Sequence, residues 1–447
     1  MNWNKMVIIN QYYLVLFLLI CACSGETRNG SSADENQEII ISRSAYKNQL
    51  YGFWLGQCIA NWTGLITEMD KIGGNGKDGN GAGFYTRASW GGPDDVNMWG
   101  SKSFSDTIDF FFADEGEIWG ADDDTDIEYI YLHLLLDHNT AMLTPRQIAE
   151  GWINHIRKEE ENYLWVSNQT AFDLMQTGIL PPETSDPANN PNYEMIDAQL
   201  TTEIFGLLAP GRPGIALKMA ELPIRTTARE NAQWIAEFYV IMHSLACLNQ
   251  DQGVRDRLFW MADEARKHLP ATSYSAKMYD FVKSQYQSGL TWEKARDALY
   301  EKYQVRQEDG YEWPSKEPVC HGCFAAGINF GASMVSLFYG EGDLKETIKI
   351  GVLCGWDSDN PTATWGGLIG FMLGKDGVEK AFGRKFSSQF NIHRTRIGFS
   401  DGGIDNFSNM AEKGLRVIDQ VVTDEIQGKV DKEENVWRIP QDRNTAR

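Results

Sequence analysis

The sequence is short of positive charge. Its 447 residues include 41 Lys and Arg against 62 Asp and Glu, which gives a formal net charge of −21 at pH 7. Binding to nucleic-acid phosphates needs a basic surface, so this balance argues against a nucleic-acid partner. An acidic balance suits instead a soluble protein that captures cations. The hydrophobic content of 42% and the charged content of 23% are ordinary for a globular protein, and the chain is long enough for a sizeable core.

The sequence also lacks strand patterns, internal repeats and linkers. We find no convincing alternation of polar and apolar residues. Apolar residues recur instead at spacings of three and four, the helical period, in residues 44–61, 126–138, 144–161, 197–208, 231–248, 275–287, 291–303, 324–340 and 343–354. Two long loops are rich in Gly, Pro, Asn and Asp: residues 70–118 and 179–196. Loops of this length in a compact domain usually have a function. We expect one compact all-α domain over residues 42–440.

The N-terminus has the pattern of an export signal. Lys5 precedes an apolar stretch that is too short and too interrupted for a comfortable membrane span. It ends in Ile20-Cys21-Ala22-Cys23, which resembles a bacterial lipobox. We therefore expect residues 1–22 to be a lipoprotein signal peptide, Cys23 to carry a lipid anchor, and residues 23–41 to form a flexible tether. An ordinary cleaved signal with incidental cysteines is the alternative. Ser24 after the cysteine favours the outer membrane or its periplasmic face, as in bacterial lipoproteins generally.

Cysteine is scarce, with 7 residues in the whole chain. An odd number remains after the N-terminal pair, so in an exported chain not all of them can pair internally: Cys58, Cys247, Cys320, Cys323 and Cys354. The spacing of Cys320 and Cys323 is that of a redox or zinc motif. A second such pair is missing, and so is a pair of histidines at zinc spacing, which weakens a zinc interpretation. We favour structural cysteines, with a disulfide and a metal or redox role as alternatives.

A row of small residues runs along the first predicted helix. Gly52, Gly56 and Ala60 recur every four residues, on one face. Each glycine inside a helix costs about 1 kcal/mol relative to alanine, so the row needs a reason. Close packing of another helix supplies one. Asn61 and Glu68 then follow at the end of a rigid, buried helix.

Acidic residues crowd residues 121–128, between two apolar segments: Asp122, Asp123, Asp124, Asp126 and Glu128. Neighbours on a helix point about 100° apart, so the first three share a site only at the turn that enters a helix beginning near Thr125. Close carboxylates repel one another unless a cation lies among them, and hard oxygen ligands favour Mg²⁺ or Ca²⁺. We expect Asp126 and Glu128 to be ordinary solvated charges or to complement the helix dipole.

A second acidic pair, Asp357 and Asp359, follows an apolar helix far along the chain and precedes a run of small residues. Ser358 and Asn360 adjoin it. Either acidic group alone is typical of a solvated loop. Because both lie at the ends of elements between apolar segments, we predict that they converge on one buried metal site.

These segments together resemble the ADP-ribosylglycohydrolase family, which includes dinitrogenase-reductase-activating glycohydrolase and the ADP-ribosyl-acceptor hydrolases. The family opens with a glycine-spaced helix, Gly-Asp-Ala-x-Gly and a downstream Glu, which Gly56 to Gly64 and Glu68 resemble. Its Ser/Thr-Asp-Asp-Thr motif is similar to residues 122–125, and its Gly-Gly-Asp-Thr-Asp-Thr motif is similar to residues 355–360. The resemblance covers most of residues 45–375 and is closest to an exported branch.

The resemblance implies a compact all-α fold with two Mg²⁺ ions in a cleft, Mn²⁺ or Ca²⁺ being alternatives. Carried over by position, the metal ligands are Asp122, Asp123, Asp124, Asp357, Asp359 and Asn360. Glu68 matches the acidic residue that activates water or positions the substrate. The substrate-binding residues expected nearby are Asn61, Trp62, Trp356 and Ser358. The implied chemistry is attack of a carboxylate-activated water on the anomeric carbon of a metal-oriented sugar.

The chain departs from the family pattern at three positions. Asn61 stands where the family has Asp, which removes a charge beside the site; Asp122 replaces Ser or Thr, and Asn360 replaces the closing Thr or Ser. Because side-chain carbonyls also bind Mg²⁺, we expect the metal site to survive and the departures to affect substrate choice.

Three functions fit these residues. The first is a Mg²⁺-dependent hydrolase of an N- or O-glycosidic bond to a ribose-like or other sugar, since an exported lipoprotein rarely meets intracellular ADP-ribosylated proteins. The second is true ADP-ribosyl hydrolysis of extracellular conjugates. The third is a non-catalytic lipoprotein that binds a sugar or a metal, against which the retention of Glu68 argues.

The tryptophans near the motifs either stack on the substrate, a small molecule or glycan, or pack the core: Trp62, Trp119, Trp356 and Trp365.

Overall fold

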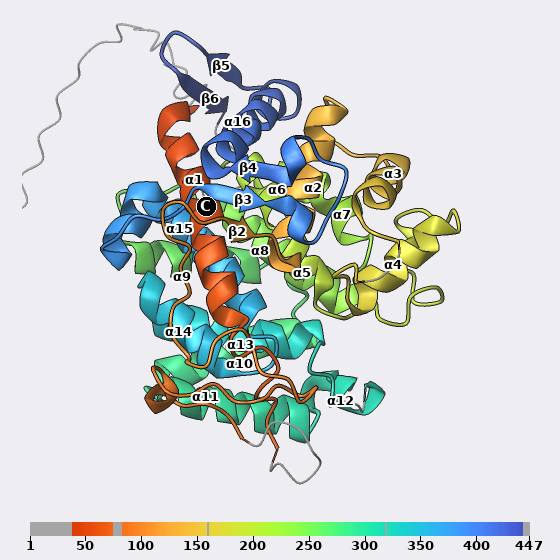
Figure 1. Ribbon diagram of the computed structural model, residues 1–447, viewed down its shortest axis with the longest axis vertical. Helices are drawn as coiled ribbons and strands as arrows, with labels where there is room; N and C mark the ends of the chain where they lie inside the picture. The colour runs from red at the N-terminus through yellow and green to blue at the C-terminus, as the bar shows by residue number, and fades with distance from the viewer. Residues whose placement is uncertain (1–37, 75–82, 159–160, 318–319, 441–447) are drawn as a thin grey trace, which may run out of the picture. The chain divides into compact units, whose positions relative to one another are not determined.

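The computed structural model describes residues 38–74, 83–158, 161–317 and 320–440 (Figure 1). The expected signal peptide, Cys23 and most of the expected tether lie outside the described residues. The helices are α1 (Arg43–Gly64), α2 (Asp123–Asp137), α3 (Pro145–His155), α4 (Val166–Gln176), α5 (Asp197–Thr201), α6 (Ile204–Leu208), α7 (Pro213–Ile224), α8 (Glu230–Leu245), α9 (Val254–Arg266), α10 (Tyr274–Gln287), α11 (Trp292–Leu299), α12 (Trp313–Lys316), α13 (Ala326–Gly340), α14 (Leu344–Cys354), α15 (Asp359–Phe382) and α16 (Phe407–Asp424).

Helices dominate the described residues, which confirms the predicted all-α class. The segment predicted as one helix over residues 197–208 is two short helices, α5 and α6, with a break at Thr202 and Glu203. The helix predicted over residues 144–161 ends at His155. Six helices that the helical period did not reveal are α4, α7, α9, α12, α15 and α16.

Two small sheets of short strands join the helices. One has the order β1-β6-β5, from β1 (Glu38–Ser42), β6 (Val436–Pro440) and β5 (Lys429–Asp431). The other has the order β2-β3-β4, from β2 (Trp119–Gly120), β3 (Gln389–Asn391) and β4 (Ile404–Asn406), with β2 parallel to β3. β1 pairs along its length with β6, so residues 38–41, which were expected in the tether, are part of the described fold.

Helices α1 and α15 pack in backbone contact and lie side by side in Figure 1. A Cβ atom added to Gly56 would lie 2.2 Å from the carbonyl oxygen of Gly366, and one added to Gly370 would lie 2.3 Å from the carbonyl oxygen of Gly52. Glycine at these positions on both helices therefore allows the close approach that the small-residue row predicted. The packing brings the C-terminal end of α1 against the N-terminal end of α15.

The cysteines of the described residues are all buried. Cys320 and Cys323 form a disulfide, one of the alternatives left open by the sequence, whereas Cys58, Cys247 and Cys354 are free thiols. In the part of the chain that the structure describes, no helix combines the length and the apolar composition that a membrane span requires.

Candidate metal centre

The first acidic group lies at the N-terminus of α2, at the helix entrance where the sequence placed it. Asp122 is the N-cap residue, with extended backbone angles, and its N–H donates to the Thr125 hydroxyl at 2.9 Å. Asp123 and Asp124 follow in the first turn, so the helix begins at Asp123 rather than near Thr125. Negative charge is favoured here, because the free N–H groups and the helix dipole are positive at this end.

The second acidic group lies in the turn between α14 and α15. Gly355 has a φ of 102°, and Trp356 has a φ of 59°, so the chain turns sharply before Asp357. The N–H of Asp357 donates to the Asn329 side chain at 3.2 Å, and the Ser358 hydroxyl donates to the Gly64 carbonyl at 3.0 Å. These bonds fix the turn against α13 and against the end of α1.

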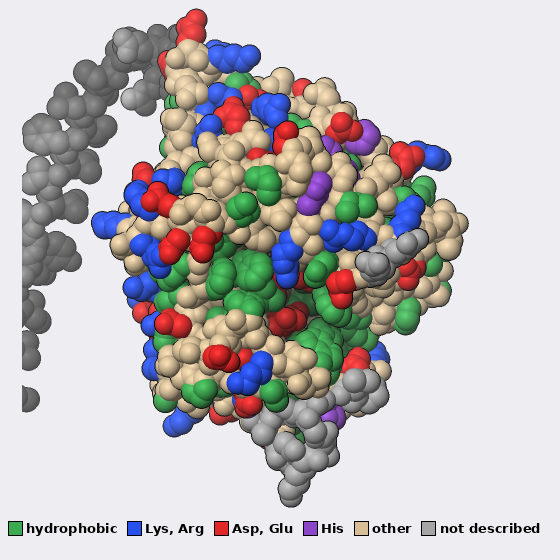
Figure 2. Space-filling view, in the orientation of Figure 1, with side chains coloured by type: hydrophobic (Ala, Val, Ile, Leu, Met, Phe, Trp, Pro, Cys, Tyr) green, Lys and Arg blue, Asp and Glu red, His purple; other side chains and the backbone are tan. Residues whose placement is uncertain are grey.

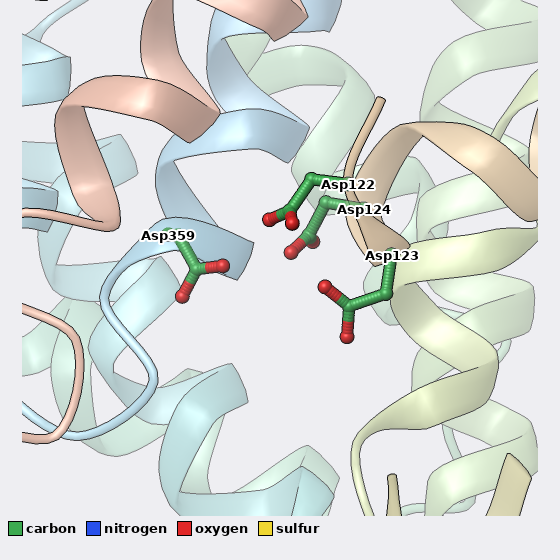
Figure 3. Close-up of side chains that lie close together, drawn as sticks. All are labelled: Asp122, Asp123, Asp124 and Asp359. Carbon is green, nitrogen blue, oxygen red and sulfur yellow. The ribbon is translucent and has the colours of Figure 1, made fainter. Parts of the chain in front are cut away.

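The two acidic groups meet in space, which confirms the predicted convergence. Carboxylate oxygens from Asp122, Asp123, Asp124 and Asp359 all lie within 4.8 Å of one another. Figure 3 shows the three side chains of the α2 end facing Asp359 at the start of α15. A second group, Glu68, Asp357 and Asp359, satisfies the same limit. Asp359 belongs to both groups, so it is the centre of the arrangement.

Five of the carboxyl groups in these two groups have a raised pKa. Burial, and then the charge of neighbouring acids, raises the pKa well above the ordinary carboxylate value at Glu68, Asp123, Asp124 and Asp357. Burial, followed by the charge of Asp122, raises the pKa of Asp359 to about 6. The Oδ1 atom of Asp359 is buried and accepts no hydrogen bond from the described residues. A set of hard oxygen donors with a buried, unpartnered oxygen fits a divalent cation such as Mg²⁺, Mn²⁺ or Ca²⁺.

Glu68 reaches the second group from a turn that follows α1. It is partly exposed, whereas Asp357 and Asp359 are buried. The next residue, Met69, has a φ of 57°, and its N–H donates to the Trp356 carbonyl at 2.9 Å. The backbone of the Glu68 turn is therefore held directly against the turn that carries Asp357.

Asn360 has a different place from the one expected. Its amide nitrogen donates to Asp124 at 3.0 Å, and its carbonyl oxygen accepts from Gln199 at 2.9 Å. In this arrangement Asn360 orients the Asp124 carboxylate, rather than offering a free ligand oxygen. Gln199 lies on α5, and sequence reasoning missed it because nothing in its local pattern connects it with the acidic motifs.

Among the carboxylates of the first group, that of Asp122 has both a charged partner and a polar partner. A guanidinium nitrogen of Arg394 lies 2.7 Å from its Oδ1 atom, and the Asn61 amide donates to its Oδ2 atom at 3.2 Å. The Arg394 guanidinium also lies over the Trp62 ring, 4.9 Å from the ring centroid. The side-chain oxygen of Asn61, Oδ1, is buried without a partner among the described residues. Sequence reasoning predicted Asn61 and Trp62 at the site, and missed Arg394.

Asp126 and Glu128 are not solvated charges, so that alternative was wrong; Asp126 lies in the first turn of α2, where it can complement the helix dipole. Both are fully buried. Asp126 forms an ion pair with Arg396, and Glu128 accepts hydrogen bonds from the Gln57 amide at 2.7 Å and the Ile204 N–H at 2.8 Å. Partners from distant segments offset the cost of burying these two acids. They lie outside both candidate ligand groups, as expected.

The predicted substrate-binding residues divide into exposed and buried ones. Trp62 is half-buried, with its indole N–H donating to the Gly120 carbonyl at 2.9 Å. Trp356 and Ser358 have no exposed surface, which corrects the expectation that they touch a substrate. Trp356 packs on Phe84 with ring centroids 4.9 Å apart. Two other tryptophans named with the motifs are core residues, Trp119 and Trp365.

Comparison with known proteins agrees with this arrangement. The sequence profile of the ADP-ribosylglycohydrolase family matches residues 42–394, which include both acidic groups. The chain belongs to the ADP-ribosylglycohydrolase family. The match to this family ends at Arg394, the residue that pairs with Asp122. A comparison with curated protein sequences gave no match.

Among solved structures, one described as an "ADP-ribosylglycohydrolase-related protein complex" is similar to the chain, with a TM-score of 0.46 and 14% sequence identity. The alignment covers 84% of this chain and 99% of that chain.

Proposed function

We propose that this ADP-ribosylglycohydrolase-family protein is a Mg²⁺-dependent glycoside hydrolase. Its substrate is an N- or O-glycosidic bond to a ribose-like or other sugar. The observation that carries the proposal is the pair of carboxylate groups that share Asp359, with the partly exposed Glu68 in one of them. Membership of a glycohydrolase family supports the hydrolase class.

The donor groups divide the proposed ligands between two ions. Asp122, Asp123, Asp124 and Asp359 would hold one, and Asp357 and Asp359 would hold the other, with the Glu68 carboxylate beside it. When bound, Mg²⁺ supplies Lewis-acid stabilisation and an anchor for sugar hydroxyls. Asn360 keeps the Asp124 carboxylate turned toward the site, and Arg394 balances the charge of Asp122.

Glu68 is the proposed general base. Its carboxylate lies in one group with those of Asp357 and Asp359, at the edge of the proposed metal site. Its partial exposure gives a water molecule access to it, which the buried Asp357 and Asp359 do not offer. Glu68 takes the proton from that water as the water attacks the anomeric carbon. The glycosidic bond breaks, and the leaving oxygen or nitrogen takes the bonding electron pair and a proton from solvent.

A second candidate is hydrolysis of ADP-ribosyl conjugates, which the family membership favours. This reaction uses the same carboxylates on a ribose whose other end carries a diphosphate. The two candidates differ in the substrate and not in the chemistry, so one assay with both kinds of substrate separates them.

The decisive assay is a panel of aryl glycosides, N-ribosides and an ADP-ribosylated peptide, each with MgCl₂ and with EDTA. We expect turnover of at least one substrate with MgCl₂, loss of turnover with EDTA, and a fall of about 10²–10⁴-fold in kcat for Glu68→Gln. The matched control is Glu150→Gln, an exposed glutamate on α3. Glu68→Gln and Asp359→Ala variants that melt normally and retain full turnover would overturn the proposal.

We also propose that the chain is a lipoprotein of the outer membrane or its periplasmic face, anchored at Cys23. The lipobox-like residues 20–23 support this. Cys23→Ser is expected to move the protein from the membrane fraction to the soluble fraction. A variant that stays with the membrane fraction refutes the anchor.

A further inference from the structure

Three aromatic side chains form an exposed group, which we call the aromatic platform: Trp99, Trp165 and Phe324. Half of the Trp99 surface and 45% of the Trp165 surface are exposed. The Trp99 ring lies 6.3 Å from the Trp165 ring, with an angle of 23° between the ring planes. It lies 6.2 Å from the Phe324 ring at an angle of 29°. The Trp99 ring is therefore nearly parallel to both of its neighbours, and the three rings form one apolar group with exposed surface on both tryptophans.

The segment that carries Trp99 is hydrogen-bonded to the turn that carries Glu68. The N–H of Met98, the residue before Trp99, donates to the Met69 carbonyl at 2.9 Å, and Met69 directly follows Glu68. This segment belongs to the long Gly- and Asp-rich loop, residues 70–118, whose length indicated a function. The loop therefore holds the residue before a tryptophan against the residue after the proposed general base.

The segments that carry the other two rings are each linked by hydrogen bonds to residues that adjoin the acidic groups. The residue before Phe324 is Cys323, whose carbonyl accepts from Asn329 at 2.8 Å, and Asn329 also accepts the N–H of Asp357. Trp165 is the N-cap of α4. The Ser167 hydroxyl in the first turn of α4 donates at 2.6 Å to Asp197, on α5, the helix that carries Gln199.

Hydrophobic side chains flank a recessed group of acidic side chains on this face of the protein (Figure 2). An exposed tryptophan pair beside a buried charged site is costly to leave in water and has the shape to stack on a ring. The flat C–H face of a sugar ring and the face of a nucleobase are both suitable partners. These two ligands differ in charge, because the nucleobase of ADP-ribose is joined to a diphosphate, whereas a sugar ring of a neutral glycan is not.

The cations near the site already have partners. Arg394 is bound to Asp122 and to the Ala121 carbonyl at 2.6 Å. The Arg157 guanidinium donates to the carbonyls of residues 393–396, and Lys71 pairs with Asp95. A diphosphate would have to compete for these groups against a net charge of −21. A neutral ring carries no such cost.

We propose that the aromatic platform binds a second sugar ring of a neutral glycan whose first ring lies at the acidic groups. This inference rests on the proposed function and names its substrate class, an uncharged saccharide of at least two rings. Trp99 is the central residue, because its ring lies within 6.3 Å of both of the others.

The test measures binding directly, by calorimetry in MgCl₂, in a Glu68→Gln background that does not turn over the ligand. The probes are neutral oligosaccharides of two to five rings built from glucose, xylose, arabinose, mannose or galactose, their monosaccharides, and ADP-ribose. We expect at least one oligosaccharide to bind. Trp99→Ala should weaken the affinity for that oligosaccharide about tenfold and leave the affinity for its constituent monosaccharide unchanged. Trp99→Phe and Val305→Ala, a change at a residue that is 49% exposed, should leave the affinity within about threefold.

Three results overturn the platform: no oligosaccharide binds, Trp99→Ala binds the oligosaccharide as tightly as its parent, or ADP-ribose alone binds. The outcome is separable from that of the proposed function. Trp99-dependent binding without hydrolysis by the wild-type protein supports the platform and refutes the hydrolase. Hydrolysis with Trp99-independent binding supports the hydrolase and refutes the platform.

Discussion

Arg396 lies with a guanidinium nitrogen 2.9 Å from a carboxylate oxygen of Asp126, and neither side chain has any exposed surface. The same guanidinium donates to the backbone carbonyls of Asn162 and Tyr163, at 2.5 and 3.1 Å. The ion pair therefore ties the first turn of α2, which carries the candidate ligands, to the segment that leads into α4.

Removing one partner of this pair should be strongly destabilising. Arg396→Met leaves the Asp126 carboxylate buried without its cation, and we expect the free energy of unfolding to fall by about 3–5 kcal/mol. The control is Lys47→Met, which breaks the exposed ion pair between Lys47 and Glu412 and should cost at most about 1 kcal/mol. Urea denaturation followed by circular dichroism measures both. Equal losses in the two variants would refute a structural role for the buried pair.

The contact between α1 and α15 should not tolerate a single methyl group on its axis. In Gly56→Ala the new Cβ atom meets the Gly366 carbonyl oxygen at 2.2 Å, so the helices must separate, at a cost of about 1–3 kcal/mol or more. Gly214 lies on α7 and has open space around its Cβ position, so Gly214→Ala should stabilise by up to about 1 kcal/mol. Melting temperatures that move in the same direction would contradict this description of the interface.

The buried Glu203 should make stability depend on pH. Burial raises the pKa of its carboxyl to about 7 from an ordinary value of 4.5, so the folded state holds this proton more tightly than the unfolded state. That contribution is complete below pH 4.5 and is lost as the pH rises through 7, at a cost of about 3 kcal/mol. Glu203→Gln removes it.

We therefore expect the stability of Glu203→Gln relative to wild type to rise between pH 4.5 and pH 8. Denaturation curves across this range measure the difference. Exposed Glu150→Gln is the matched control and should follow the wild-type profile. A Glu203→Gln profile that runs parallel to wild type excludes Glu203 as the titrating group.

An acidic substitution at Asn61 changes the net charge of the metal centre and so tests whether a cation binds there. Its amide donates to Asp122 at 3.2 Å, so Asn61→Asp replaces a donor with a second negative charge. We expect the melting temperature in EDTA to fall and saturating MgCl₂ to restore most of the loss, because a cation neutralises the added repulsion. Thermal melts with and without MgCl₂ check this, with Asn61→Ser as the uncharged control. A loss of the same size in both conditions contradicts the assignment of this end of α2 as a cation site.

The acidic groups were predictable from the sequence because each is a local concentration of charge at the end of an apolar segment. The small-residue face of α1 was predictable for a similar reason, since its period is visible within one helix. Arg394 and Gln199 were not predictable. Each is an isolated polar residue, and only the tertiary packing brings it to Asp122 and Asn360.

The wrong expectations have related causes. Whether Asp126 is solvated depends on Arg396, which approaches from the far end of the chain. Trp356 and Ser358 belong to a motif that forms the site, but their side chains point into the core, and the motif does not reveal the direction. Strands of two or three residues, such as β2 and β3, are too short to show a period of two.

A calorimetric titration of the metal-free protein with MgCl₂ tests the central claim most directly. The two carboxylate groups predict saturable binding of two ions per chain to the wild type. Asp359→Asn, which alters the residue common to both groups, should lose both binding events and still melt cooperatively in EDTA, whereas Glu68→Gln should keep both. Absence of saturable binding to the wild type, or unchanged binding to Asp359→Asn, would contradict the assignment of this cluster as a metal centre.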